Sequence, residues 1–372
     1  MLLVGASVTW DSNPQRLSSS EDPQAALGTP EKSDRITAAY VALRFDRSQA
    51  QQRLLLEVSK SAVRYDNLSY LDFEPLSYSA AWVWSLGPRL GGTLAATRTE
   101  AQVNYADFNN VSQRNVRTSE NYGLSVDADL SGGWHLVGAA TQEKQKNEVT
   151  FVEQGSYEAN GGSAGVKYVT AAGNSLTAQV RGLDGQYLGQ ALQPVALLDT
   201  GFRRLERELL AAWKFAPKSS LGARLAQIDY RSDNFRERDF SGTAARAAVA
   251  WTPTAKLSLN LAAGRDVGPW EADYASYRVD EGLSVAPAWQ IGARTVVRAS
   301  FERIESDHRN PIPAYSGEPR DDSLRRVLLA VDWQPRRGLS VNASLQRERR
   351  TSSRPLEDYE RRIATLGASL TF

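Results

Sequence analysis

The chain has 372 residues, and its 44 Lys and Arg residues nearly balance 43 Asp and Glu residues, which gives a formal net charge of +1. Only 41% of the residues are hydrophobic, and the mean hydropathy is −0.43. A spanning helix needs roughly 17 to 25 predominantly apolar residues, and even the longest uncharged stretches, such as 75–88, are shorter, so a helical membrane protein is excluded.

The first predicted element is a strand over residues 2–10, in which Leu2, Val4, Ala6, Val8 and Trp10 alternate with small or polar residues. No signal peptide precedes this strand, so we expect that a secretion signal has been removed ahead of it. The absence of cysteine fits an exported protein, which thereby avoids mispairing in an oxidising compartment.

From there to the end of the chain one unit repeats: an alternating run ends on an aromatic residue or Leu, a tight turn follows, and alternation resumes. The spacings lie between 36 and 47 residues, as expected for strand–turn–strand units that each carry one longer loop. The repeat positions are Phe45, Trp84, Leu130, Tyr168, Phe215, Trp251, Trp289, Trp333 and Phe372.

The runs have a period of two. In 257–261, Leu257, Leu259 and Leu261 fall on one face, while Ser258 and Asn260 fall on the other. A sheet can cross a membrane only if it closes on itself, because no backbone group can stay unpaired in hydrocarbon. The pattern therefore predicts an all-β, transmembrane, antiparallel up-and-down barrel with an apolar exterior. A soluble sandwich or propeller is the alternative.

Two strands before the turn at Phe45 and two per interval give about eighteen strands, with 16 and 20 as bounds, in a single domain over residues 1–372. Both termini then lie on the periplasmic side, where the turns are short. Longer, charged connections are expected on the opposite, extracellular side. They are residues 11–33, 106–117, 187–198, 231–236, 306–319 and 350–356.

Several aromatic residues lie within a few positions of a proposed short turn, which predicts a girdle at the headgroup level of the membrane. This set comprises Trp84, Trp213, Trp251, Trp289, Trp333 and Phe372. Ordinary core tryptophans of a soluble sheet are the alternative. Other aromatic residues on the loop side are expected to form a second girdle or to stack on sugars. These are Tyr65, Tyr70, Phe73, Tyr105, Phe108, Tyr274 and Tyr277.

Two N-terminal segments, 5–17 and 63–94, resemble the exosortase-associated exopolysaccharide biosynthesis family of outer-membrane barrels (the EpsL type), and more loosely a broader group of bacterial porin-like barrels. The resemblance rests on Asp11, Ser12, Asn13, Arg16, Arg64, Tyr65, Leu71, Asp72, Tyr78, Trp82, Trp84 and Gly87. It implies outward passage of a polysaccharide chain through the outer membrane, with periplasmic polysaccharide-export proteins as partners. We expect a monomeric barrel.

Alternation also predicts which charged residues face the lumen. They are Arg98, Glu100, Asp127, Asp129, Lys167, Arg181, Glu206, Glu208, Arg246, Arg298, Glu302, Arg326 and Asp332. Such residues can select and slide a solvated polymer, and because both signs occur, a neutral or weakly charged sugar polymer fits best. The alternative is that these charges only keep the lumen wet and pair with one another.

Two segments are rich in arginine, 231–240 and 347–362, but acidic residues interleave with the basic ones. Because nucleic acids require a continuous basic stripe, we expect no nucleic-acid partner. Outer-membrane lipid, in particular lipopolysaccharide phosphates, is the expected partner of these arginines, and solvated loop charge is the alternative.

Catalysis has little support in the sequence. The two histidines, His135 and His308, are expected at opposite ends of the barrel, beside a periplasmic turn and in an outer loop. No nucleophile elbow, phosphate-binding glycine loop or metal-binding cluster occurs, so we expect no enzyme, cofactor or metal. We therefore expect a conduit for exopolysaccharide export. The alternatives are a general or substrate-selective porin for small solutes and a barrel that only scaffolds an export complex.

Overall fold

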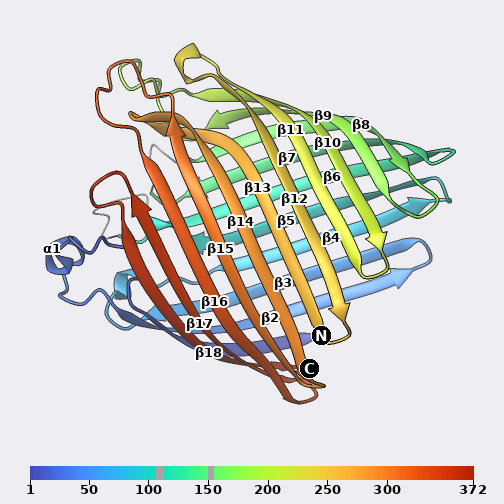
Figure 1. The fold of residues 1–372 in the computed structure, drawn as a ribbon, viewed down its shortest axis with the longest axis horizontal. Coiled ribbons are helices and arrows are strands. Elements are labelled where there is room, and N and C mark those ends of the chain that lie inside the picture. Colours follow the sequence, from blue (N-terminus) through green and yellow to red (C-terminus); the bar gives the residue numbers. More distant parts are fainter. Residues whose placement is uncertain (106–112, 150–154) are drawn as a thin grey trace.

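The computed structural model describes residues 1–105, 113–149 and 155–372, which form one closed antiparallel barrel (Figure 1). Each strand pairs with its neighbours in sequence, and the first strand pairs with both the second and the last. The prediction of about eighteen strands in a transmembrane barrel is confirmed. The strands are β1 (Leu2–Asp11), β2 (Asp34–Gln49), β3 (Gln52–Tyr65), β4 (Leu76–Leu86), β5 (Leu90–Gln102), β6 (Val116–Ser131), β7 (Trp134–Asn147), β8 (Tyr157–Val169), β9 (Ser175–Tyr187), β10 (Gly201–Ala216), β11 (Ser219–Ser232), β12 (Phe240–Thr254), β13 (Leu257–Ala272), β14 (Ala275–Gly292), β15 (Thr295–Arg309), β16 (Asp321–Arg336), β17 (Leu339–Ser352) and β18 (Tyr359–Thr371).

In the described part of the chain, helical structure is confined to short pieces in the connections. They are α1 (Pro23–Leu27), η1 (Ser69–Leu71) and η3 (Arg236–Arg238). The carboxylate of Asp22 caps α1 by accepting a hydrogen bond from the backbone N–H of Gln24. Within the described ranges, none of the helices has the length and apolar character needed to cross a membrane.

The two ends of the barrel differ in the length of their connections (Figure 1). At one end, where both termini lie, the turns are short. Residues 132–133 join β6 to β7, and residues 337–338 join β16 to β17. Gly132, Gly133 and Gly338 have positive φ, which these tight turns require. At the other end the connections are longer, up to residues 12–33 between β1 and β2.

Most predicted loops lie close to the observed ones, with three differences. The sequence did not indicate the connection of residues 66–75 or the connection between β7 and β8. At the same end, β13 joins β14 through a turn of only residues 273–274. Most of the predicted loop 106–117, with Phe108, lies outside the described residues.

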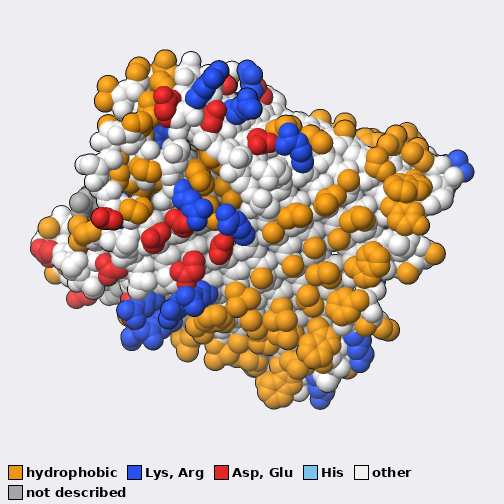
Figure 2. Space-filling model, turned by 45° about the horizontal axis from the view of Figure 1, so that its top comes forward, with side chains coloured by type: hydrophobic (Ala, Val, Ile, Leu, Met, Phe, Trp, Pro, Cys, Tyr) orange, Lys and Arg blue, Asp and Glu red, His pale blue; other side chains and the backbone are white. Residues whose placement is uncertain are grey.

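The outer face of the barrel is apolar, as the period of two predicts. Leu261 lies opposite Val249 on one side and Val285 on the other, and Val285 lies opposite Phe301. Large hydrophobic side chains on this face remain exposed all round the barrel. Figure 2 shows hydrophobic surface over one half of the molecule and charged side chains over the other. The exposed hydrophobic surface is the lipid-facing part.

The predicted girdle residues are placed on this outer face near the short turns. Trp213, Trp251, Trp289, Trp333 and Phe372 are exposed there, whereas Trp84 is half-buried beside Gly92. The sequence did not single out two further exposed residues of the same face, Trp82 and Trp134. The ring centroid of Trp134 lies 4.9 Å from that of Tyr168.

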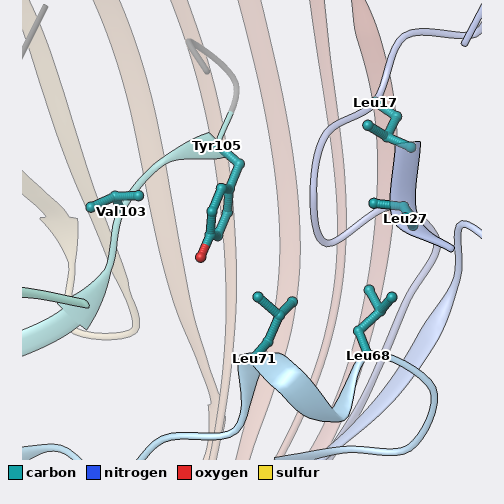
Figure 3. Close-up of a cluster of buried hydrophobic side chains, with 6 residues drawn as sticks. All are labelled: Leu17, Leu27, Leu68, Leu71, Val103 and Tyr105. Atoms are coloured by element: carbon teal, nitrogen blue, oxygen red, sulfur yellow. The ribbon is translucent and has the colours of Figure 1, made fainter. Parts of the chain in front are cut away.

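A small hydrophobic core lies inside the loop end (Figure 3). Leu17 and Leu27 come from the β1–β2 connection, and they pack with Leu68, Leu71, Val103 and Tyr105. The tyrosines expected in a second girdle or at sugar sites are placed differently. Tyr105 and Tyr274 are buried, and Tyr65 and Tyr70 pack against this core. The reason is that the loops fold inward, so that these rings pack against other loop side chains instead of facing lipid or solvent.

Candidate functional site

The candidate site is the lumen of the barrel and its mouth at the loop end. Strand pairing places most of the predicted lumen charges on the face opposite the lipid-facing residues. This inward set comprises Asp127, Asp129, Lys167, Arg181, Glu206, Glu208, Arg246, Arg298, Glu302, Arg326 and Asp332. Their part in guiding a solute remains a prediction.

Arg98 and Glu100 are corrected: both lie on the outer face. Pairing from β4 through β6 is regular, so Arg98 shares its face with the exposed Leu94. The guanidinium of Arg98 lies 2.5 Å from the carboxylates of both Glu100 and Glu120. These charges are tolerated on the outer face because they sit toward the loop end and neutralise one another.

The lumen wall carries a compact ion-pair cluster on β10 and β11. Glu206 and Glu208 are almost fully buried, and Arg224 binds both, at 2.7 and 2.6 Å. Arg204 reaches Glu206 at 2.6 Å, and the side-chain amide of Gln179 donates to Glu208 at 2.6 Å. The buried charges are thus paired, which is the condition for keeping them in the wall.

A second cluster lies near the short turns. The carboxylate of Asp127 forms a hydrogen bond with Nδ1 of His135 at 2.7 Å and an ion pair with Lys167. Farther round the barrel, Arg298 pairs with Asp332 at 2.5 Å. Asp127 and Arg298 on the turn side of the lumen are therefore each paired with an opposite charge.

Toward the mouth, Arg326 bridges Glu302 and Glu348, the latter at 2.8 Å. Glu348 also pairs with Arg16 of the β1–β2 connection at 3.2 Å and accepts a hydrogen bond from the Tyr359 hydroxyl at 2.9 Å. The sequence did not predict the pairing of Glu348 with Arg16, because it depends on how the first loop enters the barrel.

The β13–β14 hairpin bends into the mouth. Pairing of β13 with β12 stops at Arg265, and the hairpin continues beyond it. Val267 and Val279, which fall on the outer face by alternation, pack against Phe240 on the inner side of β12. The outer face of the hairpin therefore covers the inner face of β12. This places the hairpin inside the barrel wall, where it narrows the opening of the barrel.

Arg238 clips this hairpin to the loop between β9 and β10. Its guanidinium donates to the carbonyl oxygens of Ala272 at 2.8 Å, Ala275 at 2.7 Å and Ala196 at 2.9 Å. The residue is only 2% exposed, and burial lowers the pKa of the guanidinium. The side chain of Arg238 thus joins the β9–β10 connection to the β13–β14 hairpin, which is four strands farther along the chain.

A neighbouring network joins the β13–β14 turn to the β15–β16 and β17–β18 connections. Arg320 is fully buried. It pairs with Asp322 at 2.8 Å and Glu357 at 3.3 Å, and it donates to the Tyr274 hydroxyl at 3.0 Å. His308, expected in an outer loop, instead ends β15 and is buried with its ring centroid 5.1 Å from that of Trp270. The opposite-end placement of the two histidines is as expected.

A row of rings lines one side of the mouth. Phe202 stacks on Tyr230 at 5.4 Å, Tyr230 on Phe240 at 4.8 Å, and Phe240 on Tyr277 at 4.8 Å between centroids. The row borders a recess of about 440 Å³ that Trp270 and Glu271 of the hairpin close from the other side. The stacked rings connect β10, β11 and β12 to β14 of the hairpin.

In residues 1–105, 113–149 and 155–372, no group of His, Asp or Glu residues could hold a metal ion. A deeper recess of about 550 Å³ is lined by charged residues of both signs, among them Arg246, which has no ion-pair partner in the part of the chain described. Arg246 is thus available to a passing solute.

Comparison with known proteins places the fold. No family model and no curated protein matches the chain. Three solved structures of Pseudomonas aeruginosa proteins are similar over almost the full length. The outer membrane protein OpdK has 10% identity, a TM-score of 0.52 and coverage of 100% of this chain and 98% of that one. OccK2 (OpdF), in complex with glucuronate, has 11% identity, a TM-score of 0.53 and coverage of 99% and 97%. OpdK with vanillate has 11% identity, a TM-score of 0.52 and coverage of 100% and 98%. The shared fold and the apolar exterior place this chain in the bacterial outer membrane.

Proposed function

We propose that the protein is a substrate-selective porin for small polar solutes. One observation carries the proposal: the mouth is narrowed by the β13–β14 hairpin. Arg238 donates hydrogen bonds to two carbonyls of this hairpin, at 2.8 and 2.7 Å, and to one carbonyl of the β9–β10 connection, at 2.9 Å. A constriction built from buried polar contacts is costly to move. It suits repeated passage of small molecules more than passage of a continuous polymer.

The chemistry of the lumen supports the same proposal. Paired charges line the wall, and Arg246 stands unpaired over a recess of about 550 Å³. An unpaired guanidinium attracts an anionic or hydrogen-bond-accepting group. The similar structures that carry glucuronate and vanillate hold solutes of that size and charge. Small carboxylates and acidic sugars are therefore the first solutes to test.

Export of an exopolysaccharide, which the family resemblance implies, is the competing proposal. It requires an opening of the mouth wide enough for a sugar chain, and so it requires release of the hairpin. Liposome swelling with the purified protein separates the two. Monosaccharides and small carboxylates should enter, and oligosaccharides should be excluded progressively with length.

Two variants sharpen the test. Arg246→Gln should slow entry of small carboxylates relative to neutral sugars of equal size, because the unpaired charge is removed. Arg207→Gln, on the outer face and paired with Asp229 at 2.6 Å, is the matched control and should leave both rates unchanged. Equal entry of long and short sugars through the unmodified protein would contradict the porin proposal and favour the conduit.

A further inference from the structure

Five arginines stand together on the outer face of four neighbouring strands, β15 to β18, toward the loop end. We call them the arginine patch: Arg303, Arg325, Arg347, Arg349 and Arg362. All five are exposed. Only part of the arginine-rich segment 347–362 contributes, because Arg350 and Arg361 of the same strands point inward.

The register places like charges directly opposite one another. Arg325 lies opposite Arg303 on β15 and opposite Arg349 on β17, and Arg347 lies opposite Arg362. Facing cations on one side of an antiparallel pair destabilise the sheet. The arrangement therefore calls for anions between the guanidinium groups.

The protein itself supplies too few anions. Glu305 pairs with Arg303 at 2.5 Å, and Glu360 is shared by Arg347 and Arg362, at 3.1 Å each. Glu360 also lies opposite Arg349 in the register, but neither Arg325 nor Arg349 forms an ion pair among the described residues. Two arginines on the outer face of β10, by contrast, have acidic partners. Arg203 pairs with Asp184 at 3.2 Å, and Arg207 with Asp229 at 2.6 Å.

The patch borders the lipid-facing surface. On the same strands, the outward residues nearer the short turns are apolar and exposed, among them Val327, Leu329, Leu345 and Leu366. In Figure 2, Lys and Arg side chains likewise stand directly beside hydrophobic surface. Five cations at the upper edge of the hydrocarbon lie at the level of lipid headgroups. That level belongs to the outer leaflet, because the termini and short turns mark the periplasmic end.

We propose that the arginine patch binds the phosphate groups of an outer-leaflet glycolipid. Guanidinium groups bind phosphate through paired hydrogen bonds, and one phosphate can neutralise two facing arginines. The lipid would thus fill the gap between Arg325 and Arg349 while its acyl chains lie along the apolar surface below. This inference does not depend on which solute the lumen carries.

Native mass spectrometry of the detergent-purified barrel tests the proposal. The probes are bisphosphorylated lipid A, the same lipid with its phosphates removed, and phosphatidylglycerol. The unmodified protein should bind bisphosphorylated lipid A most tightly. The double variant Arg325→Gln and Arg349→Gln should bind it about tenfold more weakly or worse, since two charge-assisted contacts are lost.

The double variant Arg203→Gln and Arg207→Gln, on the same face but already paired, is the matched control and should bind lipid A as the unmodified protein does. Shifted gel mobility before heating shows that each variant is folded. Equal binding of dephosphorylated lipid A by the unmodified protein overturns the proposal, and this arm needs no variant. Equal binding of phosphatidylglycerol, or an equal loss in the control, also overturns it.

Discussion

Arg16, in the first loop, forms an ion pair with Glu348 of β17 at 3.2 Å, and Glu348 is only 2% exposed. The contact joins the two ends of the chain across the barrel seam. It draws the β1–β2 connection into the mouth, where Arg326 also binds the same carboxylate. The buried carboxylate of Glu348 thereby binds both the β1–β2 connection, through Arg16, and strand β16, through Arg326.

Glu348→Gln should destabilise the barrel by about 2–3 kcal/mol, because Arg16 loses its carboxylate partner and Arg326 keeps only Glu302 in a buried setting. Equilibrium unfolding in urea with lipid vesicles measures the change. Glu281→Gln is the control, since Glu281 pairs with Arg265 at 3.1 Å on the exposed outer face and its loss should cost at most about 1 kcal/mol. Equal costs for the two would show that the Glu348 cluster is not a buried network.

Arg238→Ala should raise single-channel conductance. Loss of a buried guanidinium that donates to several carbonyls weakens the hold on the hairpin by about 2–3 kcal/mol. Arg236→Ala is the control, because Arg236 is exposed in the same turn. An unchanged conductance in Arg238→Ala would mean that the hairpin does not form the constriction.

Leu345→Arg should impair membrane insertion, because a lipid-facing cation in the apolar band is destabilising, by roughly 2–4 kcal/mol at the midplane and by less toward the headgroups. Ser344→Arg, the next residue and on the lumen face, should insert normally and change conductance only. Folding yield into lipid vesicles, read from gel mobility before heating, compares the two. Equal yields would show that the faces are assigned wrongly.

Acid should loosen the loop between β9 and β10 through Asp199. Burial alone would raise the pKa of Asp199. Hydrogen bonds from the Ser232 hydroxyl at 2.5 Å and the Asn234 backbone N–H at 2.6 Å nevertheless hold that pKa below its ordinary 3.8. The carboxylate thus stabilises the fold above about pH 4, and this contribution is lost as the pH falls through the lowered pKa.

Protease cleavage of residues 188–200 after brief incubation at each pH measures that loss. Asp199→Asn should make the loop cleavable at neutral pH, whereas Asp233→Asn, more exposed in the adjacent connection, should not. Cleavage of the unmodified protein that is independent of pH down to about 3 would rule out this role of Asp199.

The strand number and the apolar exterior follow from the sequence because alternation and turns are local signals. The assignment of side chains to the lumen or to the lipid is less secure where a turn separates two strands. Arg98 and Glu100 were assigned to the lumen, although the short turn at 87–89 continues the outer face of Trp82 into Leu94. One residue in the length of such a turn inverts every side chain that follows.

The mouth could not be predicted for a different reason. Arg238, Arg320 and Glu348 look like ordinary strand or loop charges in the sequence. Their partners lie on distant segments, so burial becomes visible only when the loops are placed. Long-range ion pairs leave no periodic trace, and the two-residue turn of the β13–β14 hairpin gives no hint that the hairpin bends inward.

Single-channel recording of the purified protein in a planar lipid bilayer tests the central claim most directly. A selective porin with a narrowed mouth should conduct ions steadily without any partner protein, and addition of a small carboxylate such as glucuronate should interrupt the current briefly as each molecule passes. A barrel that stays silent alone, and conducts only when periplasmic export proteins are added, would contradict the account.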